Sequence, residues 1–232
     1  MTSLSGELDR ARSLDVASLA DAIERIGFEC TRCGACCTHE TTEEGETEPH
    51  TATVFPDEVR ELQDAMGDDK DTADGEDAEW RDVARPMPYG LEESEEGLEG
   101  ETFEWALETD ACGDCVFYEE EDGVGACTVH ADRPLICETY PFSVALGGTT
   151  QPMGEAVDSE GMVRAHECEG LGRDISREEA ENLAAALKER AVRELEEAIA
   201  VRENYEPVAP GPGEVVVHDS EGAKSADGTP LE

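Results

Sequence analysis

The chain has 232 residues, of which 59 are acidic and 17 basic, so its formal net charge at pH 7 is −42. A surface this acidic repels nucleic acid and anionic lipid, and we expect neither as a partner. No apolar run approaches the ~20 residues that cross a bilayer. The first residues, MTSLSGELDRARSLD, lack the basic and apolar regions of a secretory signal. We therefore expect a cytoplasmic protein.

The N-terminal part predicts helices around a short strand. Apolar residues at helical spacing predict a helix over residues 7–27, with Gly27 as its end. TATVF, residues 51–55, predicts a strand, and Pro56 opens a second helix. Acidic residues and glycine dominate residues 67–101, which predicts a loop or a mobile insertion.

The C-terminal part predicts short strands, one long helix and a tail. Short strands and turns are expected from residue 102 to residue 170. Ser176 and Glu179 form a capping box that starts a long helix, which we expect to pack on the N-terminal helix. Its predicted buried face comprises Leu183, Leu187, Val192, Leu195 and Ile199. Residues 206–232 read as a flexible acidic tail, although the valines at 215–217 could add one strand.

Nine cysteines are the candidate functional residues, and a reducing cytosol favours metal ligands over disulfides. Three pairs have the C-x-x-C spacing that turns two sulfurs toward one ion. The nine are Cys30, Cys33, Cys36, Cys37, Cys112, Cys115, Cys127, Cys137 and Cys168. Eight thiolates satisfy two four-sulfur sites, of zinc or of an iron–sulfur cluster, and leave one over.

The adjacent pair Cys36–Cys37 gives the sharpest constraint on these sites. Neighbouring side chains point to opposite faces of an extended backbone and diverge by about 100° on a helix. Two adjacent cysteines are therefore poorly placed to share one tetrahedral ion. We interpret the pair as serving two sites, or as including one bridging sulfur.

Three sequence blocks resemble one known family. The blocks are CTRCGACC at 30–37, the segment 111–142, which runs from ACGDC through Cys127, Arg133, Pro134 and Cys137 to Pro141, and CEGLG at 168–172. Together they resemble the YkgJ family of CxxCxxCC cysteine-cluster proteins. The resemblance implies chelation of zinc or iron over a core motif at residues 28–190.

We therefore predict an α+β fold, as a small irregular domain held together by metal, with flanking helices and short strands. A single domain is expected over residues 1–205, with the acidic insertion at 67–101 inside it.

The five histidines and Arg133 add little to this prediction. His130 stands where the family more often has Tyr, so it is a weaker ligand candidate than the cysteines. His39 and His166 lie beside cysteines as ligands or as groups that support ligands, whereas His50 and His218 are expected to face solvent. Arg133 could donate hydrogen bonds to carbonyl groups, lie near a thiolate, or form a salt bridge with a carboxylate, and the salt bridge is at least as favoured.

Three functions remain open from the sequence. The leading one is a cytosolic metal-binding protein with closed sites. The second is an iron–sulfur oxidoreductase, electron-transfer protein or accessory protein. A protein partner is compatible with each of these functions. The third is a thiol redox switch at Cys112–Cys115. A catalytic metal site with an open ligand position is disfavoured, because nine thiols are enough to fill every position. The cysteine spacing alone does not decide whether the protein is an enzyme.

The acidity itself has two interpretations. High charge with few aromatic residues is typical of disorder, and it is also typical of folded proteins that work in concentrated salt. Only three basic residues are lysines, Lys70, Lys188 and Lys224. We favour the second interpretation, because such composition resembles that of proteins from halophilic archaea.

Overall fold

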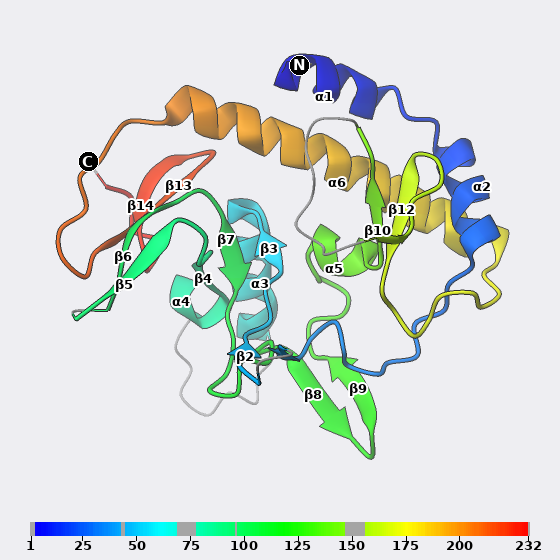
Figure 1. The fold of residues 1–232 in the computed structure, drawn as a ribbon, viewed down its shortest axis with the longest axis horizontal. Helices are drawn as coiled ribbons and strands as arrows, with labels where there is room; N and C mark the ends of the chain where they lie inside the picture. Colours follow the sequence, from blue (N-terminus) through cyan, green and yellow to red (C-terminus); the bar gives the residue numbers. More distant parts are fainter. Residues whose placement is uncertain (1–2, 43–44, 69–77, 96, 147–155, 232) are drawn as a thin grey trace. The chain divides into compact units, whose positions relative to one another are not determined.

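The computed structural model describes residues 3–42, 45–68, 78–95, 97–146 and 156–231 (Figure 1). Helices and several small sheets make a mixed α+β fold, which confirms the fold class expected from the sequence. The chain divides into two compact units. Unit 1 comprises Met1–Cys36, Glu121–Gly125 and Leu135–Ala198, and unit 2 comprises Cys37–Glu120, Ala126–Pro134 and Ile199–Glu232.

The N-terminal segment of unit 1 forms two helices where one was expected. They are α1 (Leu4–Arg12) and α2 (Val16–Ile26). The break arises at Asp15, whose carboxylate accepts a hydrogen bond from Ser18 N at 2.9 Å and so caps a new helix. Gly27 ends α2 as predicted. The apolar spacing therefore predicts which residues are helical, while the Asp15–Ser18 cap divides them into two helices.

The long helix α6 (Arg177–Asn204) packs against these two helices, as the sequence predicts (Figure 1). Its capping box is present, with Glu179 Oε2 accepting from Ser176 N at 3.0 Å. Leu187 and Leu195 are buried. Lys188 Nζ donates a hydrogen bond to Leu14 O at 2.7 Å, and ion pairs join α6 to α1 and α2. The residues of α6 beyond Ala198 belong to unit 2.

A three-stranded antiparallel sheet completes the core of unit 1. Its order is β10 (Phe142–Val144), β12 (Val163–His166) and β11 (Ala156–Asp158). The ring of Phe28 packs edge-on against Phe142, with 5.7 Å between the ring centroids. The chain entering the cysteine cluster is thereby attached to this sheet.

Unit 2 contains small sheets and two short helices. The predicted strand at 51–55 is β3 (Thr53–Val54), and the helix from Pro56 is α3 (Pro56–Asp68), so both predictions are confirmed. β3 pairs with β7 (Trp105–Leu107), and β7 pairs with β4 (Ala84–Pro86). The remaining elements of this unit are α4 (Trp80–Val83), β1 (Glu40–Thr41) and β2 (Thr47–Glu48), whereas β8 (Tyr118–Glu121) and β9 (Val124–Cys127) are divided, because Glu121–Gly125 belong to unit 1. β1 pairs with β2, and β8 with β9.

A four-stranded sheet replaces the loop and the tail expected from composition. Its order is β14 (Gly222–Ser225), β13 (Val215–Asp219), β6 (Gly97–Thr102) and β5 (Leu91–Ser94). The acidic insertion therefore supplies β4, β5 and β6, while its residues 69–77 and 96 lie outside the described residues. The C-terminal segment pairs in parallel with β6 through the valines at 215–217. Burial of apolar side chains gives the reason, because Val216 and Val217 are fully buried.

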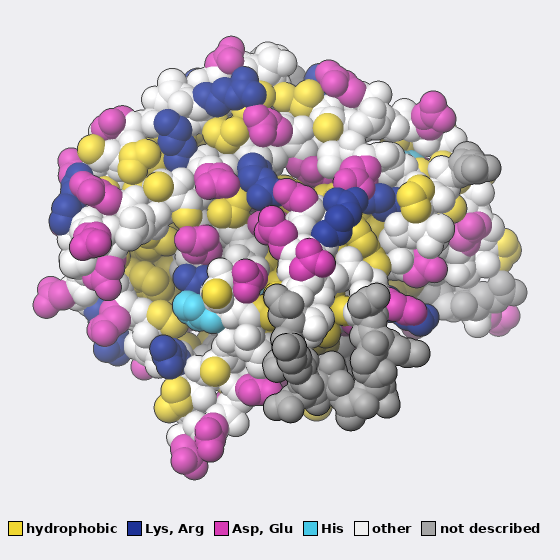
Figure 2. Space-filling model, turned by 180° about the vertical axis from the view of Figure 1, so that it is seen from behind, with side chains coloured by type: hydrophobic (Ala, Val, Ile, Leu, Met, Phe, Trp, Pro, Cys, Tyr) yellow, Lys and Arg dark blue, Asp and Glu magenta, His cyan; other side chains and the backbone are white. Residues whose placement is uncertain are grey.

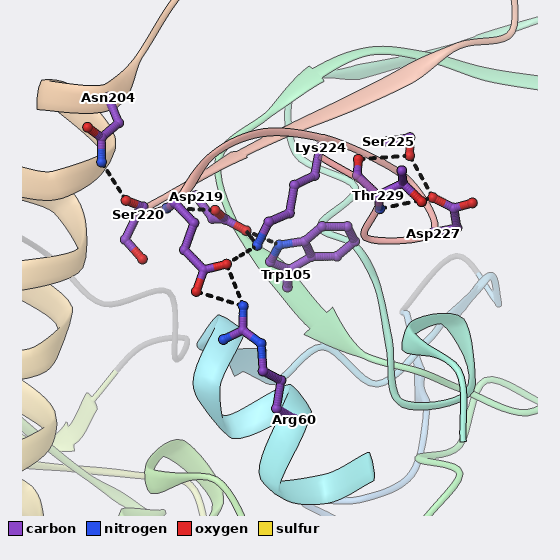
Figure 3. A network of polar contacts seen from close by, with 10 residues as sticks. Arg60, Trp105, Asn204, Asp219, Ser220, Lys224, Ser225, Asp227 and Thr229 are labelled. Atoms are coloured by element: carbon purple, nitrogen blue, oxygen red, sulfur yellow. Dashed lines mark hydrogen bonds and ion pairs between the residues drawn. The ribbon is translucent and has the colours of Figure 1, made fainter. Parts of the chain in front are cut away.

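Charged and polar side chains fix this C-terminal hairpin in unit 2 (Figure 3). The buried ammonium of Lys224 lies 2.7 Å from Asp219 Oδ2, which also accepts from Trp105 Nε1 at 2.8 Å. Glu221 joins Lys224 to Arg60 of α3. A buried pair of this kind stabilises only while both charges are present.

His218 is buried in the same sheet, so the expectation that it faces solvent is wrong. Its Nε2 lies 2.8 Å from Glu101 Oε1. Its ring stacks on Phe103 and contacts Tyr205.

Acidic side chains elsewhere are dispersed. On the face drawn in Figure 2 the carboxylates scatter among basic and apolar side chains and form no single patch. Among the described helices, none is long and apolar enough to span a membrane.

Candidate metal centres

The boundary between the two units falls between Cys36 and Cys37. All nine cysteines are thiols. Unit 1 contains Cys30, Cys33, Cys36, Cys137 and Cys168. Unit 2 contains Cys37, Cys112, Cys115 and Cys127. Each unit therefore has at least the four sulfurs of a closed centre, and the adjacent pair contributes one to each.

In unit 1, backbone pairing brings the start of the cysteine cluster beside Cys168. Phe28 forms an antiparallel bridge with Leu171, and Glu29 N donates to Gly170 O at 3.0 Å. A Cβ atom at Gly170 would lie 2.3 Å from Glu29 O, so only glycine permits this approach. The pairing explains why the sequence has Cys-x-Gly at this point, since the glycine lets Cys30 and Cys168 come together.

The thiol of Cys168 is within electrostatic reach of three other cysteines of unit 1. Burial raises the pKa of the Cys168 thiol, and the negative charges of Cys36, Cys33 and Cys30 raise it further. A hydrogen bond from Gly170 N to Cys168 Sγ, at 3.4 Å, acts in the opposite direction. Backbone N–H groups that donate to sulfur stabilise the thiolate form that a metal requires.

Cys137 is the fifth sulfur of unit 1 and lies on the short helix α5 (Leu135–Thr139). This helix starts directly after Pro134. Arg190 of α6, only 1% exposed, donates from Nη1 to Thr139 Oγ1 at 3.0 Å and to Phe142 O at 3.3 Å. The buried guanidinium thus fixes the position of α5 within the unit.

In unit 2, a tight turn holds Cys112 and Cys115. Asp110 Oδ1 accepts from Cys112 N at 2.8 Å and from Asp114 N at 3.0 Å. Cys115 N donates to Cys37 O at 2.8 Å. The C-x-x-C pair therefore lies beside Cys37, and the turn is stabilised by an aspartate that the sequence did not single out.

His39 is attached to this turn by Asp114. Asp114 Oδ1 accepts from His39 N at 2.8 Å and lies 2.7 Å from His39 Nδ1. The hydrogen bond from His39 N contributes most to the lowered pKa of Asp114. With Nδ1–H donating to the carboxylate, the neutral ring keeps an unprotonated Nε2. The position of His39 near the cluster was visible in the sequence, whereas Asp114 was one acid among many.

His50 also borders the turn, which corrects the expectation that it faces solvent. Its backbone N donates to Gly113 O at 2.8 Å, and Arg85 Nη2 donates to His50 O at 2.8 Å. Burial and the charge of Arg85 lower the pKa of His50 to about 4, so the ring is neutral at pH 7.

Cys127 is connected to the same region through the strand that it ends. Thr128 N donates to Phe117 O at 2.9 Å, two residues beyond Cys115.

Tyr118 lies close enough to Cys37 to sense its charge. Burial, a hydrogen bond to Glu120 and nearby negative charge, including that of Cys37, raise the pKa of Tyr118 to about 12. Cys37 and Tyr118 are therefore within electrostatic reach.

Two histidines proposed as weak ligands have other contacts. His130 Nε2 lies 2.7 Å from Arg133 Nη1, and because a guanidinium only donates, that nitrogen accepts. Its lone pair is then engaged by Arg133, which disfavours His130 as a ligand through Nε2. His166 is buried, with Nε2 2.8 Å from Ser143 Oγ.

The side-chain positions do not form a metal site, whereas the backbone brings cysteines of the same unit near one another. Among the described residues, no three Cys, His, Asp or Glu side chains converge in the arrangement of a metal site. Backbone pairing decides which sulfurs can reach a common ion, whereas exposed cysteine side chains rotate between rotamers at little cost. The soft thiolate donors, their grouping and the N–H···S contact fit zinc or an iron–sulfur cluster.

Comparison with known proteins identified one family. The family model "CxxCxxCC: Putative zinc- or iron-chelating domain" matches residues 29–169, a segment that contains all nine cysteines. Searches of curated proteins and of solved structures gave no match.

Proposed function

Since the chain belongs to the CxxCxxCC family of zinc- or iron-chelating domains, we propose that it is a metal-binding protein with two cysteine centres, one in each unit. The observation that carries this proposal is the unit boundary between Cys36 and Cys37. Adjacent cysteines cannot easily share one tetrahedral ion, and here they lie on either side of a structural division.

Four sulfurs are assigned to each centre. The unit 1 centre consists of Cys30, Cys33, Cys36 and Cys168, and the first three raise the pKa of the Cys168 thiol. The unit 2 centre consists of Cys37, Cys112, Cys115 and Cys127. Backbone hydrogen bonds link Cys37 to the 110–115 turn, and the bond from Thr128 N to Phe117 O holds the residue after Cys127 to the segment that follows the turn. Cys137, on α5 of unit 1, is the remaining sulfur.

The bound group decides the chemistry. Zinc in a four-thiolate site stabilises the fold and makes the protein an interaction or accessory module. An iron–sulfur cluster supplies electron transfer. With zinc or with an iron–sulfur cluster, the proposed location is a reducing cytosol, because the thiols remain available there as ligands.

Metal content and colour test the proposal directly. The full chain is purified without oxygen, and its metal content and visible spectrum are measured. We expect either a colourless protein with about two zinc ions per chain or a brown protein with about eight irons. Absence of both metals contradicts the proposal, and a reversible Cys112–Cys115 disulfide in metal-free protein would favour the redox switch instead.

Adjacent substitutions then test the division into two centres. Cys36→Ser and Cys37→Ser each should lose about half of the metal, because each removes one ligand of a different centre. The pairs C36S/C168S and C37S/C115S should retain that half, whereas C36S/C37S should lose all of it. Complete loss in either single variant, or retention of half in C36S/C37S, would show that the cysteines are not divided in this way.

A further inference from the structure

The two groups of cysteines differ in how far solvent reaches them. In the unit 1 centre, Cys30, Cys33 and Cys36 are exposed and Cys168 is half-buried. In the unit 2 centre, Cys115 is 6% exposed, Cys37 and Cys127 are half-buried, and only Cys112 is exposed. A competing ligand has to reach the sulfur that it displaces, so access is the first requirement for exchange.

The contacts that hold each segment differ in the same direction. Residues 29–33 of the unit 1 centre lie outside every helix and strand, as do Cys37, Cys112 and Cys115 of the unit 2 centre, so the difference lies in the side-chain contacts that surround each segment. The unit 2 turn is fixed by Asp110, by the His39–Asp114 contact and by close packing, since a Cβ atom at Gly113 would lie 3.1 Å from Pro49 Cα. Ligands held in place by surrounding hydrogen bonds release a metal less readily.

From these two differences we propose that the unit 1 centre is an exchange site that passes its metal to a thiol-bearing acceptor, while the unit 2 centre retains its metal. This inference rests on the proposed function, because it needs a metal in each centre. In each exchange step, one bond between the metal and a cysteine of the centre breaks as one bond to an acceptor sulfur forms. The proton from the acceptor thiol passes to the departing cysteine sulfur.

Charge indicates which acceptors approach most easily. Cys168 is flanked in the chain by Glu167 and Glu169, both exposed, and Glu29, whose side chain is 69% exposed, precedes Cys30. Two basic side chains also lie here: Arg173, 4.0 Å from Glu29, and the exposed Arg32 between Cys30 and Cys33, so carboxylates remain in excess. Carboxylates around the exposed sulfurs repel an anionic acceptor and attract a cationic one. The acceptor is therefore expected to carry its thiols beside basic residues.

Chelator competition tests the inference on the metal-loaded full chain. Metal release is followed with 4-(2-pyridylazo)resorcinol for zinc, or with bathophenanthroline for iron. We expect two phases of similar amplitude whose rates differ by about tenfold or more. Cys36→Ser should remove the fast phase and Cys37→Ser the slow phase. Release in one phase, or loss of the fast phase in C37S, overturns the inference while two equivalents of bound metal still support the proposed function.

Asp114→Asn tests why the unit 2 centre is slow. The substitution keeps the size of the side chain and removes the charge that holds the His39 ring, so the slow phase should accelerate about 10- to 100-fold. The fast phase should not change. Asp64→Asn, at an exposed position on α3, is the matched control and should leave both phases unaltered. An unchanged slow phase in D114N contradicts the role given to this contact.

A transfer assay completes the design. Two synthetic peptides carry the same Cys-x-x-Cys pair, one flanked by lysines and the other by glutamates. Faster transfer from the fast-exchanging centre to the lysine peptide at low salt, with the difference lost in about 1 M salt, is the expected result. Equal rates at low salt would contradict the predicted acceptor charge.

Discussion

The two cysteine groups are assembled by different kinds of structure. In unit 2, Cys112 and Cys115 lie on one local turn, and Cys37 joins it through a backbone hydrogen bond from Cys115 N. In unit 1, Cys30 meets Cys168 because two segments far apart in sequence pair along their backbones. A local turn survives small disturbances nearby, whereas a long-range pairing depends on every residue that lets the segments approach. The two centres should therefore fail for different reasons.

The largest expected effect concerns the polar network that stabilises unit 2 (Figure 3). Lys224→Met removes the ammonium beside Asp219, whose side chain is only 1% exposed. An uncompensated buried carboxylate should lower the free energy of unfolding by about 3–5 kcal/mol. Urea unfolding, followed by the fluorescence of Trp105 and Trp80, measures it.

Lys188→Met is the matched control in unit 1. Lys188 donates to the carbonyl of Leu14, so its removal strands no charge, and we expect a loss of about 1 kcal/mol. If the two variants were equally destabilised, the buried ion pair would not be the feature that stabilises the C-terminal hairpin.

Prediction from the sequence succeeded where the signal was local. The long helix with its Ser176–Glu179 box, the helix opened by Pro56 and the mixed fold class follow from spacing and capping. The cysteines were recognised as ligand candidates because the C-x-x-C spacing is itself a local geometry. Their assignment to two centres stays a prediction.

The features that the sequence did not predict depend on contacts between residues that are distant in the chain. The C-terminal segment is rich in acidic residues and glycine, and its composition hides three valines that become buried only against β6. The burial of His218 likewise depends on Phe103 and Tyr205. Asp114 could not be chosen from 59 acids, since its role comes from where the 110–115 turn meets His39.

A smaller effect should separate the long-range pairing of unit 1 from simple glycine strain. Gly170→Ala places a Cβ atom against Glu29 O, so the two segments must move apart. We expect a loss of about 1–3 kcal/mol in stability, together with the metal of the unit 1 centre. The metal content should fall by about half, and metal release to the chelator should show only the slow phase.

Gly172→Ala provides the comparison two residues away. Its φ of +76° makes alanine unfavourable by about 1–2 kcal/mol, yet no atom lies within 4 Å of the new Cβ. Stability should therefore fall while both centres keep their metal. Loss of the unit 1 metal in G172A as well would mean that the centre responds to general strain and not to the pairing at Gly170.

The smallest effect concerns the pH dependence of unit 2. The pKa of His50 is about 4 in the folded protein, against an ordinary value of 6.5, so the unfolded chain takes up the proton first as the pH falls. Stability contributed by the neutral ring is complete above pH 6.5 and is lost progressively down to pH 4. His50→Gln removes this titration and should keep the backbone hydrogen bond to Gly113. Between pH 7 and pH 5, the variant should therefore lose about 1–2 kcal/mol less stability than the parent in urea unfolding. Parallel curves for the two proteins would contradict a neutral, buried His50 beside the Cys112–Cys115 turn.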